Sequence, residues 1–134
     1  MATLTKTDYA KVWSQACAAG EAAAAAAVPT PMVVVEADLF GRPLPDGKTW
    51  HVPSGVCGFA EVVIKPATSG FAKWLKAQGI ARPHYYGGIS VFVHPKCVSG
   101  PMVQSMEIKE AWARAAAKVL QDHGIPAHAT SRMD

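Results

Sequence analysis

The feature that most constrains the fold of this chain is an amphipathic helix that ends at a strong stop signal. Ser105 is placed to cap it, and Gly124 ends it because glycine adopts the left-handed conformation found after helices. Residues 89–94 and 127–133 on either side have the composition of strands. The apolar residues of the helix recur at helical spacing, at Ile108, Trp112, Ala115 and Val119. The C-terminal half is therefore predicted to alternate strands with helices packed on a sheet.

Similar signals predict the other elements. An alanine-rich helix is expected over residues 8–27, since alanine has the highest helix propensity and two prolines follow. The order continues with a strand at 32–37, a hairpin of strands 48–52 and 56–65, and a helix from Thr68 or Ser69 to Gly79. We predict a single α+β domain over residues 1–134, with an N-terminal helix within 1–28 and a mixed sheet in a core at 32–134.

The connections between strands 56–65, 89–94 and 127–133 predict a ligand site at one edge of the sheet. If both are right-handed, strands 56–65, 89–94 and 127–133 run parallel, and the loops leaving them meet where open α/β sheets bind ligands. Two of these loops precede helices, whose free N–H groups receive phosphate or carboxylate. The predicted anion-binding residues are Lys65, Thr68, Ser69, Gly70, Lys96, Ser99, Ser105 and Arg132. For the hydroxyl residues at the helix starts, capping alone is the alternative.

The stretch 49–66 places His51, Cys57 and Glu61 close together in the sequence, as in a nucleophilic site. Alternation across the predicted hairpin argues against a Cys–His dyad, because it sends His51 and Cys57 to opposite faces. We expect Cys57 to be a core residue. Glu61 faces Lys48 in this hairpin and is either its surface partner or a catalytic carboxylate.

A metal site has little support. His94 and Cys97 have the spacing of one zinc knuckle, whereas a structural zinc site normally needs two such pairs. Residues 46–49 match the end of a phosphate-binding P-loop, but Arg42 stands where that motif needs glycine, and a strand follows. We therefore predict no metal and no cofactor. His94 is kept as a candidate catalytic residue because histidine titrates near neutral pH.

The segment 82–88, Arg-Pro-His-Tyr-Tyr-Gly-Gly, places aromatic and cationic side chains beside flexible glycines. Such a loop is suited to stacking on bases, as in single-strand binders. The alternative, which we favour, is that its tyrosines cover the edge of the core and keep their hydroxyls in water. In the parallel arrangement this loop lies at the amino ends of the strands, away from the predicted anion site.

Composition narrows the class of partner. The 13 basic and 10 acidic residues give a formal charge of +3, which permits an anionic partner but is low for a protein that coats DNA. Three cysteines without regular spacing provide no disulfide framework, so we expect a reducing cytoplasm. The start lacks signal-peptide features, and the alanine run at 22–27 is too short to cross a bilayer. We therefore expect no membrane partner.

The first predicted helix has a smooth face. Ala16, Gly20 and Ala24 recur every four residues, so another backbone can approach this face closely. Packing on the sheet and contact with a second subunit are the two interpretations. The second leads us to expect a homo-oligomer.

Two segments of the chain carry a resemblance to known proteins, CGFAEVVIKPATSGFAKWLKAQG and QSMEIKEAWARAAAKVLQDHGIPAHATSRMD. They resemble small uncharacterised proteins encoded by tailed bacteriophages. The resemblance covers roughly residues 56–134 and leaves the first helix outside. It implies action in the cytoplasm of a bacterial host, on nucleic acid, nucleotides or host machinery. It implies no catalytic residues.

Three functions are consistent with these features. The first is binding of an anionic small molecule or nucleic acid at the predicted sheet edge, and we rank it first because no nucleophile has a convincing base. The second is a small enzyme that uses Glu61 or His94 in acid–base or lyase chemistry on a nucleotide-like substrate. The third is an interaction module that docks through its first helix.

Overall fold

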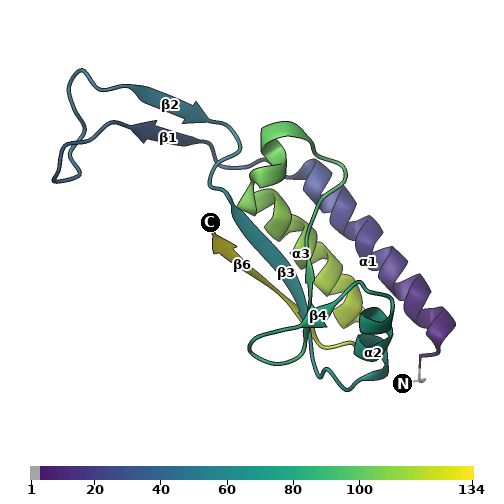
Figure 1. Ribbon diagram of the computed structural model, residues 1–134. Coiled ribbons are helices and arrows are strands. Elements are labelled where there is room, and N and C mark those ends of the chain that lie inside the picture. Colours follow the sequence, from purple (N-terminus) through teal and green to yellow (C-terminus); the bar gives the residue numbers. More distant parts are fainter. Residues whose placement is uncertain (1–3) are drawn as a thin grey trace.

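The computed structural model describes residues 4–134 and shows a body and a projecting arm (Figure 1). The sheet of the body contains, in spatial order, β4 (Arg82–Pro83), β5 (Ile89–Phe92), β3 (Gly58–Ile64) and β6 (Ala127–Met133). A separate two-stranded ribbon of β1 (Met32–Val35) and β2 (Thr49–Val52) forms the arm, which extends away from the helices. The predicted α+β class is confirmed.

Helix α1 (Lys6–Ala26) begins two residues earlier than predicted. Its cap is Thr5, whose hydroxyl accepts a hydrogen bond from the Asp8 N–H, while the Asp8 carboxylate accepts one from the Thr5 N–H at 2.8 Å. The smooth face of α1 is buried against α3 (Met106–Asp122), rather than against the sheet. Packing within the chain therefore accounts for the small-residue spacing of this helix.

Helix α3 contacts β3, β6 and α1 and forms much of the core. The Ser105 cap is confirmed, since its Oγ accepts a hydrogen bond from the Ile108 N–H. Helices α1 and α3 run antiparallel, because the Thr30 N–H just after α1 donates to Glu107 at the start of α3, and Gln15 meets His123 at its end.

Lys109 departs from the predicted pattern. Its position outside the apolar stripe of this helix predicts an exposed side chain, yet it is 6% exposed. Its Nζ donates to the Gly58 carbonyl at 2.9 Å and lies 5.3 Å from the centre of the Phe59 ring. The long aliphatic stem packs over the end of β3 while the ammonium finds an acceptor, which residue spacing along a helix does not reveal.

The sheet is antiparallel throughout, so the prediction of parallel strands is wrong. Central strand β3 pairs antiparallel with both β5 and β6. The chain leaves β3 at Ile64, forms α2 (Gly70–Ala77), re-enters the sheet as edge strand β4, and then begins β5 at Ile89, directly opposite Ile64. The right-handed crossover rule applies only to parallel neighbours, and this connection stays at one end of the sheet.

The predicted hairpin is also wrong. Strand β2 pairs with β1, placing Trp50 opposite Val34, and it does not pair with β3. Cys57 forms an isolated bridge with Ser105 and is exposed, so it is not the predicted core residue. Residues 53–55 form a corner between the arm and the body, in which Ser54 is buried. None of the helices in residues 4–134 is both long and apolar enough to cross a membrane.

Candidate ligand-binding site

The helices cover one face of the four-stranded sheet and leave the other face open. Along β3, Ala60, Val62 and Ile64 belong to the core beneath the helices, whereas Phe59 and Glu61 point to the opposite side. The cross-strand register adds residues from both neighbouring strands to this side. We call it the open face, and it consists of Phe59, Glu61, Ser90, Phe92, Thr130 and Arg132.

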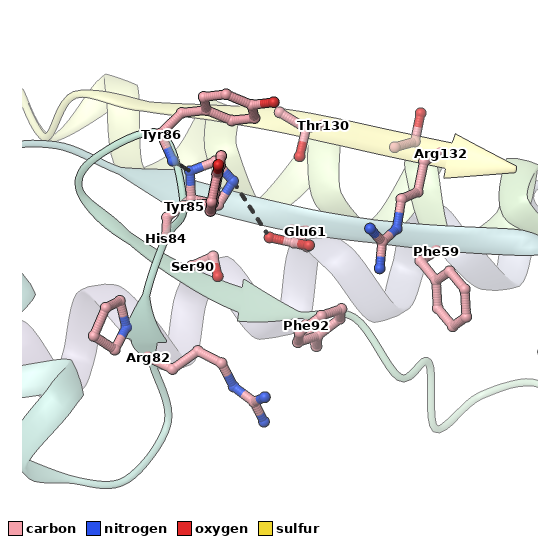
Figure 2. A pocket seen from close by; sticks show the side chains of 12 residues that line it. Phe59, Glu61, Arg82, His84, Tyr85, Tyr86, Ser90, Phe92, Thr130 and Arg132 are labelled. Atoms are coloured by element: carbon pink, nitrogen blue, oxygen red, sulfur yellow. Dashed lines mark hydrogen bonds and ion pairs between the residues drawn. The ribbon is translucent and has the colours of Figure 1, made fainter. Parts of the chain in front are cut away.

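A cavity of about 440 Å³ lies on the open face. Figure 2 shows its side chains in front of the sheet, with helices behind. The turn between β4 and β5 folds toward it and adds Arg82, Pro83, His84, Tyr85 and Tyr86 to its lining. The cavity thus combines residues of all four strands with one loop.

Glu61 lies near the middle of the cavity. Its neighbours across the sheet are Phe92 on β5 and Thr130 on β6. Its carboxylate is 3.7 Å from His84 Nε2, and both side chains are largely buried, with exposed fractions of 17% and 16%. The predicted partner Lys48 is instead in the arm, next to β2. The prediction that Glu61 faces a lysine is therefore wrong.

The tautomer of His84 follows from its neighbour. The Tyr86 N–H donates to His84 Nδ1 at 3.4 Å, so Nδ1 is an acceptor and the proton of the neutral ring is on Nε2. Nε2 is the nitrogen that faces Glu61. The carboxylate therefore lies beside an N–H group.

Two arginines flank the cavity, and each lies over a phenylalanine ring. The guanidinium of Arg82 is 5.2 Å from the ring centre of Phe92, and that of Arg132 is 5.4 Å from the ring centre of Phe59. Within residues 4–134, neither guanidinium forms an ion pair with a carboxylate. Among the described residues, the open face therefore presents two guanidinium groups outside any ion pair, each placed over an aromatic ring.

Two tyrosines project at the rim. Tyr85 and Tyr86 are 90% and 78% exposed, and their rings meet edge to face at 4.9 Å. The prediction that these tyrosines cover the edge of the core is therefore wrong. Their exposed π-faces are available to a planar ligand.

The predicted anion site is divided between opposite ends of the sheet. Lys65, Thr68, Ser69 and Gly70 follow the end of β3 at Ile64, whereas Lys96, Ser99, Ser105 and Arg132 lie near its beginning at Gly58. The length of β3 places these groups about 20 Å apart. Antiparallel pairing is the reason, because the carboxyl end of each strand lies beside the amino end of its neighbour.

Several of these residues have local structural roles instead. Ser69 Oγ accepts from the Ala72 N–H and caps α2, and Ser105 is fully buried as the cap of α3. The Lys96 N–H donates to the Glu21 carboxylate. Only Arg132 of the predicted anion-binding residues lines the cavity. Glu61 lines it as well, whereas His94 is exposed beyond the end of β5 and does not.

The cavity contains residues that sequence analysis did not assign to a site. Phe59 and Phe92 lie in the predicted strands 56–65 and 89–94, and the signal that could have found them is their alternation with the core residues of the same strands. Arg82 and the 84–86 aromatic cluster were noted as a stacking loop, but their proximity to Glu61 and Arg132 depends on the strand order.

Within residues 4–134, no group of three or more His, Cys, Asp or Glu side chains is placed so that it could hold a metal ion. His94 and Cys97 are both exposed, and Cys97 Sγ instead donates to the Glu21 carbonyl. Burial and the nearby Glu21 raise the pKa of the Cys97 thiol.

Comparisons with protein-family models, curated proteins and solved structures found no match to this chain. The class that the geometry defines is an α+β protein whose antiparallel sheet is covered on one face and carries an aromatic and cationic cavity on the other.

Proposed function

We propose that this protein binds single-stranded nucleic acid on the open face of its sheet. The observation that carries the proposal is the pair of guanidinium groups over phenylalanine rings, at Arg82–Phe92 and Arg132–Phe59. Guanidinium groups bind phosphates, and aromatic rings stack on bases at about 1 to 3 kcal/mol per base. The anionic ligand predicted from the sequence is retained, but its site moves from the sheet edge to the sheet face.

The shape of the site favours a strand over a compact anion. Arg82 and Arg132 lie on the two outer strands of the sheet, with Glu61 between them. A ligand that reaches both cations must therefore cross the sheet and pass a carboxylate. A nucleic-acid strand meets this demand, because its phosphates are spaced along a sugar backbone from which the bases project, so that two phosphates can reach the two guanidinium groups while bases stack on the rings.

Fluorescence anisotropy with labelled single-stranded RNA and DNA tests the proposal, with duplexes of the same sequences and with pyrophosphate as competitors. We expect single strands to bind and binding to weaken with salt, since phosphate contacts release counter-ions. Competition by a duplex or by pyrophosphate as strong as that by the single strand would contradict base stacking. Absence of binding at low salt would refute the proposal.

One contact favours a second function, acid–base chemistry on the bound ligand. Glu61 and the Nε2–H of His84 are 3.7 Å apart inside the cavity, and this pair replaces the predicted alternative His94. A carboxylate beside a neutral imidazole can exchange a proton with a ligand held against both. Mass spectrometry of oligonucleotides and nucleotides after incubation tests this function. Turnover that Glu61→Gln abolishes would support it.

A further inference from the structure

Residues 32–52 form a β-arm that lies outside the core of the body. Its strands are contained in their own two-stranded sheet, and no residue of the arm belongs to the hydrophobic core cluster (Figure 1). An isolated two-stranded ribbon is at best marginally stable in water. We therefore expect the two strands of the arm to be stabilised by packing against a surface outside the body of the same chain.

One face of the paired strands β1 and β2 is apolar. The register places Met32 opposite Val52 and Val34 opposite Trp50, so these four side chains share a face. Trp50 is 48% exposed and Val34 is 41% exposed. Met32 and Val52, nearest the body, are half-buried, whereas Val34 and Trp50 leave an apolar surface exposed to solvent.

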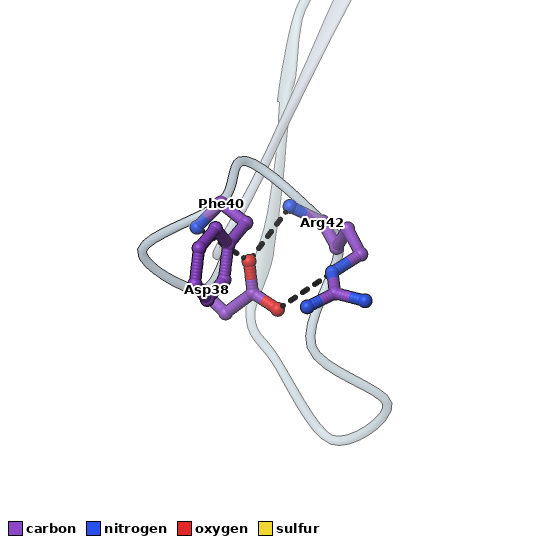
Figure 3. Close-up of polar contacts among 3 residues, drawn as sticks. All are labelled: Asp38, Phe40 and Arg42. Atoms are coloured by element: carbon purple, nitrogen blue, oxygen red, sulfur yellow. Dashed lines mark hydrogen bonds and ion pairs between the residues drawn. The ribbon is translucent and has the colours of Figure 1, made fainter.

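The tip of the arm is ordered and presents more apolar surface. Asp38 Oδ1 accepts hydrogen bonds from the N–H groups of Phe40 and Arg42, and its Oδ2 lies 3.3 Å from Arg42 Nε (Figure 3). The Arg42 guanidinium lies over the Phe40 ring at 5.3 Å. These contacts shape the turn from which the exposed side chains of Leu39 and Phe40 project. Such preorganisation lowers the entropic cost of binding.

We propose that the β-arm docks on a second copy of this chain, by reciprocal exchange of arms about a two-fold axis. An arm about 10 residues long and two strands wide has roughly 330 Å² on one face. Exchange of two arms then buries about 1,300 Å² over both partners, within the range of specific interfaces, whereas one arm on an unrelated protein buries only about half of that. Only the exchange of both arms therefore buries an area typical of a specific interface.

Charge also favours a second copy. The arm carries two basic and three acidic residues, whereas the rest of the chain carries eleven basic and seven acidic residues. An arm of net charge −1 is thus complementary to a body of net charge +4. Insertion in a lipid bilayer is disfavoured, because Asp38, Arg42 and Asp46 lie in the tip region together with free backbone groups. The predicted homo-oligomer is therefore proposed through the arm and not through α1.

Sedimentation velocity of the full chain, from micromolar to hundreds of micromolar, tests this proposal. We expect a dimer that Trp50→Glu weakens about tenfold or more, because it buries a charge at the centre of the contact. The matched control is Ile80→Glu, at an exposed apolar residue of the body, which is expected to dimerise like the wild type. Far-UV circular dichroism checks that both variants keep their helices.

Hydrogen exchange distinguishes a second copy from other occupants. Protection of the Val33–Val35 amides is expected to rise with protein concentration, while that of α3 stays constant. Three results would overturn the proposal. They are a monomer at every concentration, a Trp50→Glu dimer as stable as the wild type, and binding of the monomer to phosphatidylcholine vesicles through the arm.

Discussion

Gly20 of α1 lies directly against the indole of Trp112 on α3. A Cβ atom at position 20 would come within 2.5 Å of two ring atoms of Trp112. Only glycine leaves room for the indole here. The indole Nε1–H donates a hydrogen bond to the Glu21 carboxylate at 3.2 Å. The contact of the two long helices at this position therefore depends on this one pair of residues.

Gly20→Ala is expected to destabilise the protein by about 1 to 3 kcal/mol, since overpacking outweighs the gain in helix propensity. Thermal or urea unfolding measures the change. In a Trp112→Ala background the same substitution is expected to stabilise, because only the propensity term remains. An equal loss in both backgrounds would show that the indole is not the cause.

Glu21 links α1 to the segment after β5. Its carboxylate accepts hydrogen bonds from the N–H groups of Lys96 and Cys97, at 3.0 and 3.1 Å, and from Trp112. Burial acts to raise the pKa of Glu21, but these hydrogen bonds outweigh it and hold the pKa below its ordinary value of 4.5. The unfolded state therefore binds more protons in mildly acidic solution.

Stability from Glu21 is thus expected to be complete above about pH 4.5 and to be lost as the pH falls through the lower pKa of the folded state. Glu21→Gln should cost about 1 to 2 kcal/mol at neutral pH. The difference from wild type should shrink in acid. Urea titrations at several pH values test this, with Glu110→Gln, which disrupts a pair with exposed Arg114, as a control of little effect.

Arg132→Ala is expected to weaken single-strand binding about five- to tenfold and to reduce the salt slope by about one. Arg114→Ala is the matched control, because it also removes one exposed arginine but lies on α3 in a pair with Glu110. Anisotropy titrations at several salt concentrations compare the two variants. Equal effects would mean that net charge, and not the open face, determines affinity.

Glu61→Gln is expected to tighten single-strand binding about two- to tenfold, since it removes a negative charge located between Arg82 and Arg132. The gain should diminish at high salt. If the acid–base function holds, the same variant binds more tightly yet has no turnover. Weaker binding would instead indicate that the carboxylate accepts hydrogen bonds from the bases.

Much of the local structure was predictable because its signals lie within a few residues of one another. Ser69 and Ser105 cap the helices that they were predicted to cap, and the last strand, 127–133, has its predicted bounds. Hydroxyl caps, a glycine stop and β-branched runs act through the nearest backbone groups. Glu61 and Arg132 were predicted as site residues and both line the cavity, although the parallel sheet edge for which Arg132 was predicted does not form.

By itself, the sequence determined where helices and strands form, but only the tertiary structure decided which strands pair and in which direction. Strand β2 satisfies its hydrogen bonds with β1 as readily as with β3, and nothing local distinguishes these partners. Antiparallel pairing then separated Lys65 from Lys96 and brought Arg82 and Arg132 to the same face as Glu61. The site is a product of strand order, which depends on contacts between residues far apart in the chain.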